Sequence, residues 1–369
     1  MNALHHSTTR RQGGFSLIEI LVGMAMGLVG IVVIFQMLTT WDARKRSTTA
    51  GSDAQISGGI SMFSLEQDLK LAGWGFGQAG APIMGCTVAA KNSDPAMAAT
   101  PAVDFPLIPI EIIDGAGGAP DEIRVLYGNS AFFTSRRSFG ESTATSKKPE
   151  SRHGFQMGDR VVVADSGVPT KCVLMEVTSN LDPDTLSINH DVNPYLSYYT
   201  GVVTGPKFNP STDTTTVFSA GTMYNLGGAP QRRIWSIQNG RTLAWHDALN
   251  TPPATFNEVS DGIVNLQAEY GINTSLVAGI ITVNWSTVIP ADWSKLVAVR
   301  VGLLARSQQF EKNAVTNVEP SWAGGNFVMT DIGGIADTTP AGPTNWRNYR
   351  YRVYEKVIPL RNPIWGAVL

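Results

Sequence analysis

The feature that most constrains this chain is an apolar run from Phe15 to Leu38 with a carboxylate, Glu19, near its start. As a helix, its 24 residues are enough to cross about 30 Å of hydrocarbon. A charged carboxylate at the centre of a bilayer costs roughly 2–4 kcal/mol, and less toward the end of the span. The sequence therefore predicts a membrane-spanning helix whose acidic residue has a function.

A short polar leader precedes this run and ends in the step Gly13-Gly14. An ordinary secretory signal places its apolar core before a small-residue cleavage site, whereas here the apolar run follows the glycines. A plain single-span anchor explains the length of the run, but neither Glu19 nor the leader. These residues resemble a type IV prepilin leader, residues 1–14, which is cut after Gly14 so that Phe15 becomes the new N-terminus.

The charges beside the apolar run disagree with that resemblance. Arg10 and Arg11 lie before the run, while Arg44, Lys45 and Arg46 follow it. Counting basic residues alone places the second flank inside the cell. The resemblance implies the opposite orientation, because the peptidase of this family acts on the cytoplasmic side. We expect the leader, and not the count of basic residues, to determine the orientation of the helix in the membrane.

Composition favours a β-rich body held outside the cytosol. The chain has 28 basic and 30 acidic residues, a formal net charge of −2, and loss of the two arginines in the leader leaves −4. This balance does not indicate a basic nucleic-acid surface, so no nucleic acid is expected as a partner. Only 16% of the residues are charged, while 37 glycines and 21 prolines indicate many turns.

Two cysteines, Cys86 and Cys172, both follow the apolar run. In an oxidising compartment, pairing them is the expected outcome. Closing a loop of this length stabilises a fold by about 4–5 kcal/mol in the chain-entropy model. The alternative is two buried thiols that never meet.

Residues 15 to about 72 predict one long helix of two parts. Residues 15–38 are apolar all round, whereas residues 39–74 become amphipathic. Two sets of apolar residues at helical spacing compete for the buried face of this second part: Met62, Leu65, Leu69 and Ala72, or Ile56, Ile60 and Phe63.

The remainder, residues 75–369, predicts a β-rich body, so that the fold class is α+β with a long N-terminal helix packed on that body. A division into two lobes near residue 200 is left open. Asn239-Gly240 is a strong hairpin signal. Stretches 140–152 and 205–215 are rich in turn residues and predict exposed loops. Strands are expected at 123–127, 160–163, 172–177, 232–238, 241–245, 263–272, 296–306 and 351–360.

Few residues could build an enzyme site, and we predict neither catalysis nor a cofactor or metal. Beyond the leader, His153, His190 and His246 lie far apart, without metal-ligand spacing. His190-Asp191 is interpreted as part of a solvated acidic loop. Residues 114–122 supply oxygen ligands without the regular spacing of a calcium loop, so calcium binding stays open.

Two further patterns have structural interpretations. Residues 75–80 spell G-x-G-x-x-G, but a dinucleotide fingerprint needs a preceding strand, and here a helix precedes it. We therefore predict a turn. Seven of the nine tryptophans lie after residue 230, where we expect most of them to pack between sheets. Stacking on sugars or anchoring a partner is the alternative.

Beyond the leader, the chain resembles the PilW family of large minor pilins. Individually weak segments carry this resemblance, in an order that covers most of the chain: 65–75, 155–161, 262–267, 270–271, 299–307 and 360–362. The chain departs from many major pilins in lacking the proline that kinks their helix. A minor pseudopilin of type II secretion shares the leader and is the first alternative. A membrane-tethered binding or hydrolytic domain is the second.

The resemblance implies a mechanism. A prepilin peptidase would cut after Gly14 and methylate Phe15, and Glu19 would then be neutralised by the N-terminal amine of a neighbouring subunit. Gly23, Gly27 and Gly30 would let neighbouring helices approach closely. The implied location is the inner membrane with the body in the periplasm, then the pilus tip. The implied partners are membrane lipid before assembly, other minor pilins, the major pilin and the inner-membrane assembly platform, and a tip adhesin is left open as a further partner.

Overall fold

The computed structural model divides into two compact units, residues 1–52 and 53–369. The predicted leader falls outside the described residues except for Gly14. The structure describes residues 14–79, 83–95, 104–132, 136–151, 153–166, 171–179, 187–209, 218, 220–252, 255–275, 277, 279–329 and 345–362.

Helix α1 (Leu17–Leu71) runs for 55 residues, which confirms the predicted long helix. Gly51, Gly58 and Gly59 lie inside it without ending it. In the second unit, Met62, Leu65, Leu69 and Ala72 are the buried set, whereas Ile56, Ile60 and Phe63 are exposed. The first of the two competing apolar spacings therefore faces the body.

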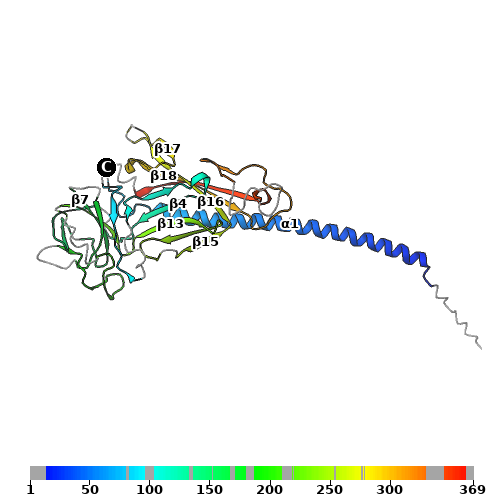
Figure 1. Ribbon diagram of the computed structural model, residues 1–369, viewed down its shortest axis with the longest axis horizontal. Helices are drawn as coiled ribbons and strands as arrows, with labels where there is room; N and C mark the ends of the chain where they lie inside the picture. The colour runs from blue at the N-terminus through cyan, green and yellow to red at the C-terminus, as the bar shows by residue number, and fades with distance from the viewer. Residues whose placement is uncertain are drawn as a thin grey trace, which may run out of the picture. The chain divides into compact units, whose positions relative to one another are not determined.

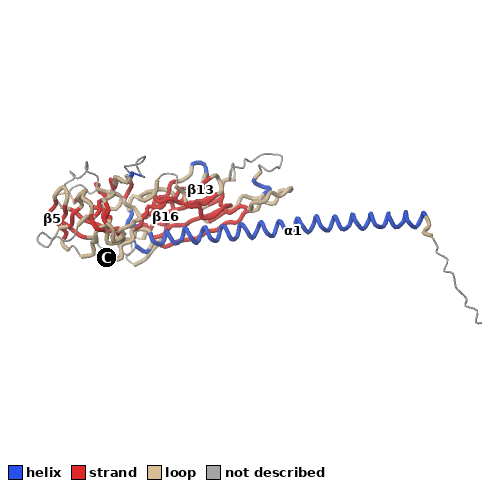
Figure 2. The backbone as a smooth tube through the Cα atoms, turned by 90° about the horizontal axis from the view of Figure 1, so that it is seen from below, coloured by secondary structure: helices blue, strands red, loops and turns tan. Residues whose placement is uncertain are grey.

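Strands fill the body, and the largest sheet has eight of them. Figure 1 shows its strand β7, and Figure 2 its strand β5, beyond the C-terminal end of α1. All of its pairings are antiparallel except β1 with β8. In spatial order it contains β2 (Phe105–Pro106), β1 (Thr87–Ala89), β8 (Lys171–Glu176), β7 (Arg160–Asp165), β12 (Gly221–Gly227), β5 (Arg137–Ser142), β6 (Ser146–Pro149) and β9 (Ile188–Asn189).

Two antiparallel sheets lie beside the C-terminal part of α1 (Figures 1 and 2). The five-stranded sheet contains β15 (Asn257–Asp261), β14 (Thr242–Asp247), β13 (Gln231–Gln238), β4 (Glu122–Tyr127) and β3 (Ile110–Ile113). The four-stranded sheet contains β17 (Val283–Ser286), β16 (Ile263–Asn273), β18 (Leu296–Arg306) and β21 (Tyr351–Pro359).

The remaining described elements are short. Two-stranded pairs are β10 (Tyr195–Leu196) with β11 (Val203–Thr204), and β19 (Ser321–Trp322) with β20 (Gly325–Asn326). Short 3-10 helices are η2 (Ala116–Gly118), η3 (Trp293–Lys295) and η5 (Trp346–Asn348).

The predicted strands are confirmed to within a few residues at each end, and so is the hairpin between β13 and β14. Its Asn239 and Gly240 have φ of 52° and 69°, the left-handed values that Asn-Gly adopts readily. Arg241 N–H donates to the carbonyl of Gln238 at 3.1 Å and closes the turn.

The predicted exposed loop at 140–152 is wrong. Residues 137–142 and 146–149 form β5 and β6, and Lys147 and Pro149 are buried. This hairpin pairs with β12 on one side and β9 on the other, so partners distant in sequence order a stretch that lacks apolar alternation. Stretch 205–215 lies partly outside the described residues, and its described part contains no strand.

The eight-stranded and the five-stranded sheets each take strands from distant parts of the chain. The eight-stranded sheet joins strands before residue 200 to β12, and the five-stranded sheet joins β3 and β4 to β13–β15. A division near residue 200 therefore does not coincide with a boundary between these sheets.

One hydrophobic core unites the buried face of α1 with strands of all three large sheets. A second core lies on the eight-stranded sheet and a third on the four-stranded sheet. β18 contributes Val301 to the main core and Leu304 to the third, which explains its nearly continuous apolar sequence. Of the late tryptophans, Trp235, Trp293 and Trp346 are buried in these cores, whereas Trp245, Trp285 and Trp322 are half-buried and Trp365 lies outside the described residues.

Candidate functional site

The start of α1 contains a capping box that the sequence reasoning missed. Ser16 Oγ accepts the backbone N–H of Ile18 at 3.3 Å, and Glu19 Oε2 accepts the backbone N–H of Ser16 at 3.0 Å. The pattern Ser-x-x-Glu before an apolar run is its sequence signal. The carboxylate of Glu19 therefore satisfies a backbone donor within its own chain, beside the predicted cleavage site at Gly14 and Phe15.

The helix that follows is open on every side in the single chain. The segment Leu17–Trp41 is the one helix of the described residues long and apolar enough to cross a membrane, and none of it is buried. Gly23, Gly27 and Gly30 have nothing within 4 Å of an added Cβ. Their spacing places them on one helical face, where a second helix could approach closely.

A second group of contacts fixes the C-terminal part of α1 to the five-stranded sheet. Its centre is Asp68, which is 3% exposed. Arg233 Nη1 donates to both carboxylate oxygens at 2.8 and 3.1 Å. Trp235 Nε1 donates at 2.9 Å and Tyr127 Oη at 3.1 Å. Burial raises the pKa of Asp68, although Arg233 acts in the opposite direction.

The four-stranded sheet contacts the same part of the helix through β21. Tyr354 Oη donates to the carbonyl of Gln55 at 2.8 Å, and its ring lies where a side chain at Gly58 would be. Lys356 Nζ lies 2.6 Å from Glu66. Its hydrogen bond and that of Lys70 lower the pKa of the Glu66 carboxyl. A glycine in the helix thus makes room for an aromatic ring from a strand nearly 300 residues later.

The helix ends at a turn that Asn362, three residues after β21, completes. Gly73 and Gly75 have φ of 79° and 91°, which favour glycine. Asn362 Nδ2 donates to the carbonyls of Leu71 and Ala72 at 3.1 and 3.0 Å, which satisfies helix carbonyls that lack intrahelical partners.

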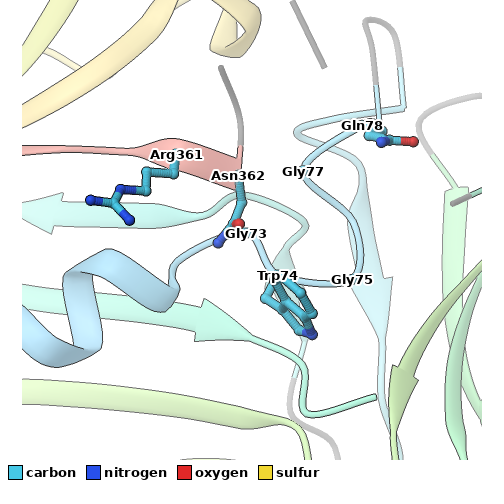
Figure 3. Close-up of a pocket in the computed structure, with 7 residues that line it drawn as sticks. All are labelled: Gly73, Trp74, Gly75, Gly77, Gln78, Arg361 and Asn362. Atoms are coloured by element: carbon cyan, nitrogen blue, oxygen red, sulfur yellow. The ribbon is translucent and has the colours of Figure 1, made fainter. Parts of the chain in front are cut away.

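Figure 3 shows the hollow at this turn, with a volume of about 300 Å³. It is lined by Gly73, Trp74, Gly75, Gly77, Gln78, Arg361 and Asn362. The described part of the G-x-G-x-x-G segment follows a helix and forms turns, as predicted. Among the described residues, no helix directly follows it. Gly80 lies outside the described residues.

The predicted disulfide is confirmed. Cys86 and Cys172 are bonded, with their Cα atoms 6.0 Å apart. Cys86 directly precedes β1, and Cys172 lies in β8 opposite Val88 of β1. The bond therefore joins two strands that are 86 residues apart in the sequence.

The interpretation of His190 as part of a solvated loop is wrong. His190 is buried, and its Nε2 lies 3.0 Å from Nζ of the buried Lys147. Lys147 Nζ donates to the carbonyl of Thr143 at 2.9 Å. Burial lowers the pKa of His190 to about 3 and that of Lys147 to about 8, so the imidazole is neutral and can accept from the ammonium.

The loop at 114–122 uses its buried carboxylate to order backbone. Asp121 Oδ1 accepts Gly115 N–H at 2.9 Å and Oδ2 accepts Ala268 N–H at 2.7 Å, and burial raises the pKa of this carboxyl to about 6. Among the described residues, no group of three or more His, Cys, Asp or Glu is arranged to hold a metal ion.

Comparison with known families agrees with this architecture. Residues 9–35 match the prokaryotic N-terminal methylation motif. Residues 238–362 match the family described as type IV pilus-assembly protein W, PilW. The second match contains β16–β18 and β21 and ends at Asn362, the residue that caps the helix. No curated protein and no solved structure gives a match.

An N-terminal methylation motif, a membrane-length apolar helix and a β-rich body define a pilin of the type IV pilus class. The matched C-terminal segment, residues 238–362, is similar to the PilW family. The predicted resemblance is thereby confirmed. These families are structural, and their members interact with the prepilin peptidase and with other pilus components.

Proposed function

We propose that this chain is a minor pilin that helps to initiate pilus assembly and sits at or near the filament tip. It waits in the inner membrane with its body in the periplasm, and a prepilin peptidase cleaves between Gly14 and Phe15 and methylates the new amine. Its partners are other minor pilins, the major pilin, the assembly platform and a tip adhesin. The disulfide supports an oxidising compartment for the body.

The observation that carries the proposal is Glu19 at the start of a fully exposed apolar helix within the methylation motif. In the single chain its carboxylate accepts a hydrogen bond from Ser16. In a filament, the amine of a neighbouring subunit offers a full opposite charge, which recovers more of the cost of placing a carboxylate in lipid. Leaving lipid thus becomes favourable only where a partner helix is present.

The size of the body supports the tip position. The described residues alone contain 21 strands. A body of this bulk would clash if it were stacked at every step of a filament, whereas a subunit at the end has space on its distal side.

Three variants separate the charge of Glu19 from its role in the helix cap. Glu19→Gln keeps an acceptor for Ser16 but loses the charge, Glu19→Ala loses both, and Ser16→Ala keeps the charge. We expect all three proteins in the membrane, and only Ser16→Ala in sheared filaments at near-normal amounts. Normal incorporation of Glu19→Gln would refute the pairing argument.

The N-terminal mass of the membrane-extracted protein tests the processing step. We expect a chain that begins at N-methylated Phe15. A chain that keeps Met1 or begins beyond Leu38 would refute the pilin mechanism and favour a membrane-tethered domain. Defective secretion of enzymes, with normal pili, in a strain lacking this chain would assign it to a type II secretion pseudopilus instead.

A further inference from the structure

The two edges of the four-stranded sheet differ in how they are protected. Edge strands expose unpaired backbone N–H and C=O groups, and proteins usually protect them with charged side chains. β21 carries Arg352, Glu355 and Lys356. Glu355 accepts the N–H of Ala323 at 2.9 Å, and Lys356 pairs with Glu66 at 2.6 Å.

β17, at the other edge, has no such protection. Residues 273–291 contain no Asp, Glu, Lys or Arg. Within the described part of the chain, no strand pairs with β17 on the side away from β16. The edge therefore presents the backbone of an uncharged strand to its surroundings.

Exposed apolar side chains lie in β17 and in the segments directly before and after it in the sequence. Six of them are between 36% and 72% exposed: Val277, Ile280, Ile281, Val283, Val288 and Ile289. Figure 1 shows β17 at the margin of the body. Scattered exposed apolar residues are ordinary, but a group gathered on one hairpin marks an interaction site.

Hydrogen bonds order the described part of the hairpin loop that precedes β17. Asn273 Oδ1 accepts the N–H groups of Ser275 and Thr282, both at 3.0 Å. Thr274 N–H donates to the carbonyl of Thr282 at 2.8 Å. The exposed apolar side chains of Val277, Ile280 and Ile281 therefore lie in an ordered part of the chain.

We propose that β17 is a docking edge that binds an uncharged, extended strand of another pilus subunit. Added beside β17, such a strand satisfies the exposed backbone groups and covers the apolar side chains in a single step. The absence of basic residues argues against an anionic lipid surface as the occupant. Trp285, the aromatic residue of β17, is half-buried beneath Arg300, whose guanidinium carbon lies 4.8 Å from the ring centroid.

This inference rests on the proposed function, because it takes the partner from the pilus. The test places a photo-crosslinking amino acid, p-benzoylphenylalanine, at Val283 of the full chain in pilus-forming cells. The matched control has the same amino acid at Val357, which is 49% exposed on the opposite edge of the same sheet. We expect cross-links from position 283 to an uncharged segment of a pilus subunit, identified by mass spectrometry, at about ten times the control yield.

Equal yields at the two positions, or cross-links from position 283 to lipid, would overturn the proposal. The N-terminal peptide of each sample keeps the two hypotheses apart. A chain cleaved before Phe15 but without cross-links from position 283 overturns the docking edge alone, whereas an uncleaved chain overturns the proposed function.

A charge on the edge supplies a second measurement. We expect Ile281→Lys to reduce incorporation into sheared filaments about tenfold, the effect of losing one strong contact residue. Val357→Lys is the control and should incorporate normally. An unchanged midpoint of unfolding shows that both variants fold, and normal incorporation of Ile281→Lys would contradict the proposal.

Discussion

Two adjacent glycines of α1, Gly58 and Gly59, differ in whether β21 leaves room for a side chain. Comparing a Gly→Ala substitution at each position therefore measures how the contact with β21 affects the stability of the fold. A Cβ added at Gly58 would lie 2.0 Å from Cε2 of Tyr354, whereas one added at Gly59 has nothing within 4 Å. Both positions lie inside the helix, where replacing Gly by Ala stabilises by up to about 1 kcal/mol. The same substitution should therefore have opposite signs at neighbouring residues.

The magnitude at Gly58 follows from what Tyr354 must give up. Moving the ring costs about 1–3 kcal/mol as overpacking, and losing its 2.8 Å hydrogen bond to Gln55 costs about 1 kcal/mol. Against a helix gain of up to about 1 kcal/mol, the expected net effect of Gly58→Ala is a loss of about 1–3 kcal/mol. Gly59→Ala should stabilise by as much as about 1 kcal/mol.

Urea unfolding of the full chain in detergent, followed by tryptophan fluorescence, measures these free energies. The same substitution is then measured in a chain that lacks the Tyr354 ring. In a chain that already carries Tyr354→Ala, the ring is absent, so Gly58→Ala should change sign and stabilise as Gly59→Ala does. If Gly58→Ala stabilises the chain that retains Tyr354, the contact between helix and strand is not made and the reasoning is refuted.

Three further variants test the other contacts. Asp68→Ala should cost about 3–5 kcal/mol in urea unfolding, because Arg233 loses its buried partner, and much less in a chain that carries Arg233→Ala. Burial raises the pKa of Asp121 to about 6, so the folded state favours the protonated carboxyl. The contribution of Asp121 to the free energy of unfolding is therefore greatest below about pH 4 and is lost as the pH rises through 6. Unfolding free energies measured from pH 4 to 7 should therefore fall by about 1–3 kcal/mol more for the parent chain than for Asp121→Asn. Replacing Cys86 and Cys172 by serine should cost about 4–5 kcal/mol, and an unchanged midpoint would contradict the loop-closure argument.

Sequence reasoning predicted the elements whose signal is local. The apolar run and its amphipathic continuation predicted α1, and alternation with Asn239-Gly240 predicted the β13–β14 hairpin. It also proposed the disulfide between Cys86 and Cys172, because compartment and count sufficed without any knowledge of geometry. In each case the information lies in the residues of the element itself or in the composition of the chain.

Apart from the local capping box of Ser16 and Glu19, it failed where order comes from distant partners. The stretch 140–152 contains turn residues and lysines, yet it forms a hairpin because β12 and β9 pair with it from the two sides. His190 was interpreted as solvated because acidic residues precede it, but it is buried and contacts Lys147, 43 residues earlier. In both cases, no pattern within the segment itself indicates the distant residues that order it.

The two ends of α1 show the same contrast in chemistry. The capping box of Ser16 and Glu19 was readable from four residues, and its carboxylate can be taken over by a stronger partner without altering the body. At the other end, Asp68 accepts from Arg233 and Trp235, about 165 residues away, and Asn362 caps the last turn. A carboxylate held by one local hydrogen bond can change partners during assembly, whereas one enclosed by donors from two strands cannot. Under the proposed mechanism, the acidic residue at the start of the helix is therefore suited to exchange between subunits, and the one near its end to holding the helix in the fold.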